Sequence, residues 1–240
     1  MARLWRAHHP DLPADPVGQT IELSREEAHH VLRVLRLSEG ATLTLFDGQG
    51  REWSGSLAHA GSGRATVLVS EEVLSIVEPV VEVVLFQGLC RADRMDWLVQ
   101  KATEVGVTEI RPLRCRRAEG RPPRIDRWQR IAVEACKQSG RRRVPSILVV
   151  DDLPDPAAPD RPALLLDPGA ATGLGRLLER RRPEGVWLAS GPESGFEETE
   201  CASWVDRGWQ AASLGPRTLR AETAGLVAAT ILLHGWGDLG

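Results

Sequence analysis

From residue 79 onward, short apolar runs alternate with amphipathic stretches, and this alternation constrains the fold more than any other feature of the chain. The run "VVEVVLFQGL" (80–89) is almost continuously apolar, as expected of a strand covered on both faces. The next stretch, "DRMDWLVQKATEVGV", has apolar residues at spacings of three and four, which predicts a helix that ends near Gly106. Strands that alternate with helices form βαβ units, so residues 76–240 are predicted to be an α/β domain with a parallel sheet.

The same rhythm continues to the end of the chain. Further strands are predicted at "TEIRPL", "SILVV", "ALLLD", "VWLAS" and "QAASL", and further helices at "RIDRWQRIAVEACKQSG", "GLGRLLERR", from Glu197, and at "ETAGLVAATILLHGW". In the helix after Arg124, the residues expected to point inward are Ile125, Trp128, Ala132, Ala135 and Cys136. The last helix is apolar almost all round from Ala224 to Leu233, so it is expected in the core of its own domain or against a second copy of the chain.

The first part of the chain has a different pattern. "ATLTLFDG", "REWSGSLAHA" and "RATVLVSEEV" are strand-like and are separated by turn residues. A short helix is expected to begin at Ser24, with Glu27 completing a capping box. Residues 1–75 are therefore predicted to form a small β-rich domain, for which a compact barrel is one arrangement.

Charge is distributed unevenly along the chain, although the net charge is only -3. Residues 111–143 contain eleven arginines and Lys137 against three acidic residues, whereas residues 151–206 contain twelve acidic residues against five arginines. The basic side chains are nearly all guanidinium groups, which suit bidentate phosphate contacts and stacking on bases. The alternative is that the two segments neutralise each other through ion pairs.

The sequence lacks the motifs that are typical of several classes of protein. The chain has no GxxxxGK[ST] phosphate loop, no GxGxxG after the first strand of the α/β domain, no HExxH and no GxSxG. The four cysteines form no CxxC pair, so buried thiols are expected rather than a metal site or disulfides. No segment is apolar enough for a membrane helix or a secretory signal, and a cytoplasmic location with no membrane partner is expected.

Two loops at the carboxyl ends of predicted strands begin with Gly-Pro: "SGPESG" (190–195) and "LGPRTLR" (214–220). In a parallel sheet these strand ends share one edge, where ligands bind. Glycine lets the backbone approach a ligand and proline stiffens that approach. An ordinary turn explains one such loop; for two loops on the same edge, ordinary turns and a binding site are equally open alternatives.

The ordered set "QKATEVGVTEIRPLRCRR", "EACKQSGRRRVP", "SGPESGF" and "SLGPRTLRAETA", after a β-rich N-terminal domain, resembles the bacterial small-subunit ribosomal RNA uridine-N3 methyltransferases of the SPOUT superfamily. The resemblance covers essentially the whole chain. It implies an N-terminal PUA-like β-barrel that helps to hold RNA, and a C-terminal α/β domain with a trefoil knot. It also implies a homodimer in which the final helix contributes to the interface.

The resemblance further implies S-adenosylmethionine (SAM) as the cofactor, no metal, and 16S ribosomal RNA or the small ribosomal subunit as the partner. The implied cofactor-binding residues are Leu166, Gly191, Pro192, Glu193, Gly195, Leu214, Gly215, Pro216, Leu219 and Arg220. The family usually has glycine where this chain has Ser194, so a positive φ at that position would strain the serine.

The reaction implied by the resemblance is methylation of uridine N3, a nitrogen that carries a proton at neutral pH. Arg220 could stabilise negative charge on a uracil oxygen, and Glu222 could accept the proton; alternatively, Glu222 only complements the dipole of its helix. The family positions expected to contact RNA are Arg117, Gln138, Arg141, Arg142 and Arg143. Two other hypotheses are a knotted methyltransferase that acts on tRNA and an RNA-binding module without catalysis.

Overall fold

The computed structural model describes residues 5–74, 77–118, 122–156, 161–178 and 181–239. The chain divides into two compact units: residues 1–78 with 133–144, and residues 79–132 with 145–240. The expected boundary between residues 75 and 76 lies outside the described residues. Each unit is described below by itself.

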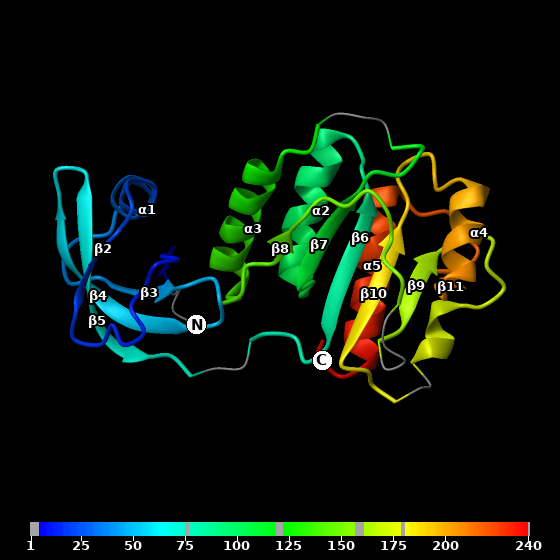
Figure 1. Cartoon of the computed structure of the whole chain (residues 1–240). Helices are drawn as coiled ribbons and strands as arrows, with labels where there is room; N and C mark the ends of the chain where they lie inside the picture. The colour runs from blue at the N-terminus through cyan, green and yellow to red at the C-terminus, as the bar shows by residue number, and fades with distance from the viewer. Residues whose placement is uncertain (1–4, 75–76, 119–121, 157–160, 179–180, 240) are drawn as a thin grey trace. The chain divides into compact units, whose positions relative to one another are not determined.

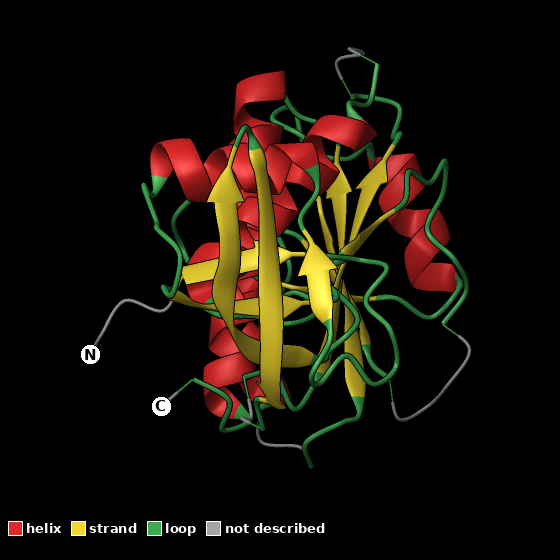
Figure 2. Ribbon diagram, turned by 90° about the vertical axis from the view of Figure 1, so that its left-hand side faces the viewer, coloured by secondary structure: helices red, strands yellow, loops and turns green. Residues whose placement is uncertain are grey.

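The first unit is built on a five-stranded sheet of order β1-β3-β4-β5-β2. Its elements are β1 (Trp5–His8), β2 (Thr20–Glu22), α1 (Arg25–His29), the π-helical turn η1 (His30–Val34), β3 (Thr42–Phe46), β4 (Glu52–Gly61) and β5 (Arg64–Glu72). Only β1 and β3 pair in parallel, and the long β4–β5 hairpin dominates the antiparallel part (Figure 2). Within the described residues no pairing joins β1 to β2, so the sheet is an open ladder.

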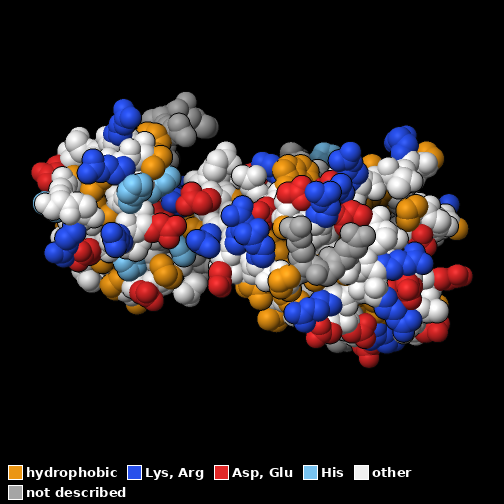
Figure 3. Space-filling view, turned by 90° about the horizontal axis from the view of Figure 1, so that it is seen from above, with side chains coloured by type: hydrophobic (Ala, Val, Ile, Leu, Met, Phe, Trp, Pro, Cys, Tyr) orange, Lys and Arg blue, Asp and Glu red, His pale blue; other side chains and the backbone are white. Residues whose placement is uncertain are grey.

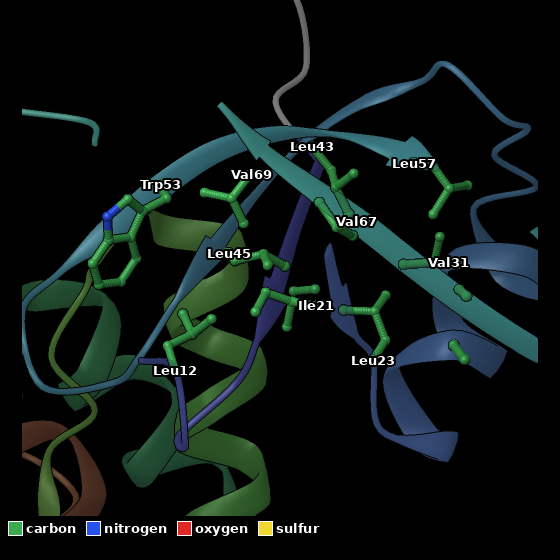
Figure 4. Packing of buried hydrophobic residues seen from close by; sticks show 13 residues of the cluster. Leu12, Ile21, Leu23, Val31, Leu43, Leu45, Trp53, Leu57, Val67 and Val69 are labelled. Atoms are coloured by element: carbon green, nitrogen blue, oxygen red, sulfur yellow. The ribbon is translucent and has the colours of Figure 1, made fainter. Parts of the chain in front are cut away.

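One face of this sheet and helix α1 enclose an apolar core (Figure 4). Alternate positions of β3, β4 and β5 point inward because successive side chains of a strand face opposite sides. Leu43, Leu45, Leu57, Val67 and Val69 are all at most 1% exposed. This burial explains why the three predicted strands form where the sequence places them.

Helix α1 begins as expected, but Glu27 makes a different contact from the one predicted. The Ser24 hydroxyl accepts a hydrogen bond from the Glu27 amide at 3.2 Å, which is the first half of a capping box. The Glu27 carboxylate instead accepts hydrogen bonds from Lys137 at 3.0 and 3.1 Å. Burial raises the pKa of Glu27, and the ammonium group of Lys137 opposes that rise.

A buried ionic network joins residues 133–144 to the N-terminal strands. The two oxygens of Glu52 accept from Arg6 at 2.7 Å and from Arg142 at 3.0 Å. Arg6 also donates to the main-chain carbonyls of Cys136 and Arg141, at 2.5 and 3.0 Å. Residues 133–144 are therefore part of the first unit because their backbone and side chains satisfy buried polar groups there.

The second unit contains a six-stranded sheet of order β11-β9-β10-β6-β7-β8, in which every pairing is parallel. Its elements are β6 (Glu82–Gly88), α2 (Ala92–Val105), β7 (Glu109–Leu113), the first half of α3 (Ile125–Ser139), β8 (Ser146–Ile147), β9 (Ala163–Leu166), the 3-10 turn η2 (Leu174–Leu177), β10 (Gly185–Ser190), α4 (Glu198–Asp206), β11 (Gln210–Ala212) and α5 (Ala221–Gly235). The α/β class and the parallel sheet predicted from the sequence are confirmed.

Helices cover both faces of this sheet (Figure 1). Helix α5 packs against α2 and against strands β6 and β10. The opposite face carries Phe86, Trp187 and Trp209, whose rings lie 5.6–6.1 Å apart, and Trp204 of α4 joins the same apolar cluster. Of the two places expected for the last helix, a place in the core of its own unit is confirmed for Ala228, Ala229, Leu232 and Leu233, which have no exposed surface.

Two local predictions for the second unit are wrong, and a third is confirmed only in part. The helix predicted at 173–181 is only the short turn η2 in the described residues, and residues 179 and 180 lie outside them. The strand predicted at 146–150 is regular only at Ser146–Ile147, with a further isolated bridge between Val150 and Leu113. Ile125 is 41% exposed rather than inward, because it is the first residue of its helix and lies at the end of the buried face.

None of the helices in the described parts of the chain combines the length and the apolarity needed to span a bilayer.

The buried Glu52 pairs predict a large stability effect. We expect Glu52→Ala to lower the free energy of unfolding by about 3–5 kcal/mol, because it leaves two buried guanidinium groups without their carboxylate. Urea denaturation followed by circular dichroism measures the change. Glu22→Ala is the matched control, since it breaks the exposed pair with Arg64 and is expected to change stability little. Similar losses for the two variants would contradict the proposed importance of burial.

Candidate functional site

The carboxyl ends of β9, β10 and β11 surround a cavity of about 790 Å³ in the second unit. Figure 3 views the molecule from the side to which these strand ends point, and basic and acidic side chains alternate over this part of the surface. The cavity, called the main cavity below, is lined by Arg94, Arg117, Leu166, Asp167, Pro168, residues 190–196, Glu198, Cys201, Ala212, Leu214, Gly215, residues 217–221 and Ala224. Ligands bind at this edge in other parallel sheets.

The first loop at the main cavity, residues 191–195, is held against the end of β6. A Cβ atom on Gly88 would lie 2.5 Å from the ring and nitrogen of Pro192, so only glycine allows this approach. The side-chain amide of Gln87 donates to the carbonyl of Gly191 at 3.0 Å. Neighbouring strands β6 and β10 thus fix the backbone of the loop.

Ser194 adopts no positive φ, so the strain considered for this position does not arise. The residue with left-handed backbone geometry is Gly195, at φ 70°, whose amide donates to the carbonyl of Pro192 at 2.9 Å. The Ser194 hydroxyl donates to the carbonyl of Arg117 at 2.8 Å, and the Arg117 guanidinium donates to the carbonyl of Ser194 at 3.3 Å. The serine therefore ties Arg117 to the loop.

The second loop follows β11 and forms the opposite wall. Ser213 exchanges backbone hydrogen bonds with the segment before η2: its amide donates to Thr172, and its carbonyl accepts from Leu174, both at 2.9 Å. Gly215 has φ 95° and leaves open space where a side chain would stand. Pro216 is exposed and is absent from the cavity lining, in contrast to the other nine cofactor-binding residues named from the sequence.

A second cavity of about 500 Å³, called the side cavity, is lined by Arg91, Asp93, Arg94, Trp97, Arg220, Glu222 and Thr223. Arg94 and Arg220 line both cavities. Glu222 belongs to the side cavity and is only 8% exposed. Of the two catalytic candidates, Arg220 therefore lies at the boundary between the two cavities, and Glu222 lies in the side cavity.

Arg94 connects three separate elements at this boundary. Its Nη1 lies 3.4 Å from Oε2 of Glu222 and 3.6 Å from Oε1 of Glu193. The same Glu193 oxygen accepts from the backbone amide of Arg91, at the start of α2, at 3.1 Å. One guanidinium therefore offsets the charge of the carboxylates from the loop after β10 and from the first turn of α5.

Thiol and metal chemistry have no support among the described residues. Burial raises the pKa of the Cys90 thiol, and the nearby carboxylates of Glu193 and Glu222 raise it further, so this thiol stays protonated. Burial also raises the pKa of Cys115 to about 11 and that of Cys136 to about 12. No group of three or more His, Cys, Asp or Glu side chains in the described part of the chain could hold a metal ion.

The residues expected to contact RNA divide into two groups. Arg117 is exposed and lines the main cavity, whereas Gln138, Arg141, Arg142 and Arg143 belong to the first unit. Gln138 and Arg143 are exposed, but Arg141 and Arg142 are at most 6% exposed. The structure differs here from the expected open arginine run, because Arg141 pairs with Glu78 at 2.9 Å and Arg142 with Glu52 at 3.0 Å.

Sequence reasoning missed several residues of the lining. Asp167 follows Leu166 at the end of β9, so the strand-end rule could have found it. Arg94 and Trp97 occupy the polar face of a predicted helix, where nothing distinguishes them from an ordinary solvated face. Only the folded chain shows that this face meets the start of α5.

The two cavities combine a large space walled by backbone and apolar groups with a smaller space that holds guanidinium groups and a buried carboxylate. The first suits a ligand of cofactor size, and the second suits a polar group that both donates and accepts hydrogen bonds. The chain has the domains of an RNA methyltransferase: residues 77–233 match the model of the RNA methyltransferase domain, and residues 23–70 match the RNA methyltransferase PUA domain.

Similar proteins define the family more narrowly. Ribosomal RNA small subunit methyltransferase E of Synechocystis is 32% identical, over 90% of this chain and 73% of that protein. The Bacillus subtilis enzyme of the same name is 27% identical, over 90% of each chain. The chain belongs to the family of ribosomal RNA small subunit methyltransferase E.

Solved structures agree with this assignment. The Neisseria gonorrhoeae ribosomal RNA small subunit methyltransferase E, bound to S-adenosyl methionine, superposes with a TM-score of 0.90 at 34% identity and covers 99% of this chain and 100% of its own. A putative methyltransferase of Legionella pneumophila, also in complex with SAM, gives a TM-score of 0.85 at 29% identity, over 96% of this chain and 97% of its own.

The Gly88–Pro192 contact predicts a sensitive position. We expect Gly88→Ala to lower the free energy of unfolding by about 1–3 kcal/mol, because the added methyl group displaces the backbone at Pro192. Thermal and urea denaturation measure the change. Gly175→Ala is the matched control, because no atom lies within 4 Å of its added Cβ and its φ is not positive. Equal stabilities of Gly88→Ala and the unmodified protein would refute the tight packing described here.

Proposed function

We propose that this protein uses SAM to methylate N3 of a uridine in 16S ribosomal RNA. The observation that carries the proposal is the main cavity, because both Gly-Pro loops and the end of β9 wall one space at the carboxyl edge of the parallel sheet. Membership of the ribosomal RNA small subunit methyltransferase E family supports the reaction and the substrate.

The main cavity suits SAM in size and in chemistry. Its volume of about 790 Å³ is in the range of pockets that enclose small molecules and cofactors. Backbone groups of residues 191–195 and 214–219 would hold the adenosine and amino-acid parts, and the open space at Gly215 leaves room for close approach. When bound, SAM supplies a methyl group carried on a sulfonium sulfur. Leu166, Gly191, Pro192, Glu193, Gly195, Leu214, Gly215, Leu219 and Arg220 are the proposed contacts.

Arg220 and Glu222 are the proposed groups that act on the base. Uridine N3 carries a proton, and the carboxylate of Glu222, which is 8% exposed, would accept it. Arg220 would stabilise the negative charge that develops on a uracil oxygen. Arg94 keeps the Glu222 carboxylate oriented through its 3.4 Å contact.

Exposed groups of both units are proposed to hold the RNA. Arg117, Gln138 and Arg143 are open to solvent, whereas Arg141 and Arg142 could contact phosphate only if their pairs with Glu78 and Glu52 opened. Arginine–phosphate contacts release counterions, so RNA affinity is expected to fall steeply with salt.

Finer features of the fold belong to the same proposal. The N-terminal sheet is proposed to be a PUA-like barrel, the second unit to hold a trefoil knot, and the protein to be a homodimer that acts in the cytoplasm. Support for the knot comes from the chain path, since α5 follows the edge strand β11 yet packs against the central strands β6 and β10. Support for the dimer comes from the partly exposed apolar side chains of Val227 and Ile231 on α5.

Cofactor binding is tested by calorimetry. We expect one SAM site per chain, and at least a 100-fold weaker Kd in Gly215→Trp, because the indole would fill the main cavity. Gly237→Trp is the matched control: Gly237 also has a positive φ and open surroundings, but it lies outside the cavity lining. Absence of SAM binding by the unmodified protein would leave only an RNA-binding module.

The substrate is tested with methyl-labelled SAM and either small ribosomal subunits, free 16S RNA or tRNA, followed by digestion and identification of the labelled nucleoside. We expect 3-methyluridine from the ribosomal RNA. Glu222→Gln should lower kcat by about 100-fold or more, because an amide cannot take the N3 proton. Asp206→Asn, an exposed change on α4, should leave kcat unchanged. Label found only in tRNA would overturn the substrate assignment.

A further inference from the structure

The side cavity lies beside the main cavity, and of its lining residues only Arg220 is among the proposed SAM contacts. It is formed where the first turns of α2 and α5 meet, since Arg91, Asp93, Arg94 and Trp97 come from the start of α2, and Arg220, Glu222 and Thr223 from the start of α5. Its volume is about 500 Å³, which is large enough for a small ligand. Its boundary with the main cavity consists of Arg94 and Arg220.

Trp97 is the aromatic member of this lining. The side chain is 44% exposed, which is unusual for a tryptophan that could pack against a helix neighbour. Arg94 and Trp97 are three residues apart and are therefore neighbours on the surface of α2, and Arg91 is the N-cap residue of that helix. An open indole beside guanidinium groups is the combination that binds nucleotides, because bases stack on the ring and phosphates pair with arginine.

The polar groups of the side cavity match one base better than the others. The Watson–Crick edge of uracil presents a donor, N3–H, between two carbonyl acceptors. Arg94 and Arg220 provide donors, and Glu222 provides an acceptor that is 8% exposed and already lies 3.4 Å from Arg94. Cytosine presents an amino donor and an unprotonated N3, so it would place its donor against a guanidinium and offer Glu222 no N3–H to accept.

The hydrogen-bonding groups of the side cavity are also held in place before any ligand binds. Arg94 is kept between Glu222 and Glu193, at 3.4 and 3.6 Å, and Glu193 is in turn fixed by the amide of Arg91 at 3.1 Å. Because Glu193 belongs to the loop that walls the main cavity, the orientation of Arg94 depends on that loop. The same contacts therefore position both spaces relative to each other.

We propose that the side cavity is the subsite for the target nucleotide, in which the uracil stacks on Trp97 and presents its imide edge to Arg94, Glu222 and Arg220, while Arg91 pairs with a flanking phosphate. The inference rests on the proposed function, because it assigns a place to the base that this function requires. A base in structured RNA must leave its stack to reach such a subsite.

Trp97→Ala tests the subsite. Methyl transfer to 16S RNA at saturating SAM should show a KM for RNA raised about 10-fold or more, and filter binding should show a similar loss of RNA affinity, because one stacked base is lost. Trp97→Phe should restore both values to within about threefold of the unmodified protein, since the phenyl ring still stacks. SAM affinity by calorimetry should be unchanged in both variants. Val205→Ala, a truncation of another exposed apolar side chain on α4, is the matched control and should change nothing.

Base recognition is tested with nucleotides as inhibitors. Uridine 5′-monophosphate should compete with RNA at least about fivefold more strongly than cytidine 5′-monophosphate. Equal inhibition by the two nucleotides, or an unchanged RNA KM in Trp97→Ala, would overturn the subsite.

Sedimentation velocity separates a role in assembly from a role in binding the base. If Trp97→Ala lost RNA affinity together with a change of oligomeric state, the side chain would be an interface residue and the subsite would be refuted. Failure of the unmodified protein to methylate RNA would instead refute the proposed function itself. The two failures are therefore distinguishable.

Discussion

The site depends on how closely the ends of β6 and β10 approach each other. Gly88 has no side chain, so the ring of Pro192 can lie against it, and Gln87 binds the carbonyl of Gly191 at 3.0 Å. This contact fixes the loop that carries Glu193, and Glu193 in turn orients Arg94 and the start of α2. A single close backbone contact between two parallel strands thus determines the shape of both cavities.

The helices and strands of the α/β unit could be predicted from the sequence because buried apolar residues recur at the spacing typical of a helix or of a strand. Continuous apolar runs became strands of a parallel sheet, and the helix of Met95, Leu98 and Val99 ends at Gly106, whose φ is 116°. Predictions failed where the pattern was short or at an end. Residues 173–181 have few apolar positions and form only a turn where described, and Ile125 lies beyond the buried face of its helix.

The candidate site was predictable to the extent that it follows strand ends. Both Gly-Pro loops could be assigned to one edge because parallel strands all point the same way. Arg94 and Trp97 could not be found in this manner, since their role arises from the contact of two helix starts far apart in the sequence. The burial of Arg141 and Arg142 was equally hidden, because it depends on Glu78 and Glu52, which the charge count of the basic segment does not include.

Because residues 133–144 belong to the first unit, the two units are difficult to express as separate fragments. A fragment that starts at Pro79 would retain Lys137 and Arg142 without Glu27 and Glu52, and would expose carbonyls that Arg6 now covers. Conversely, a fragment that ends at Glu78 would contain Arg6 and Glu52 but not residues 136–142, to which both side chains form hydrogen bonds. The two units are interleaved in sequence, so neither can be excised as a complete unit by a single cut.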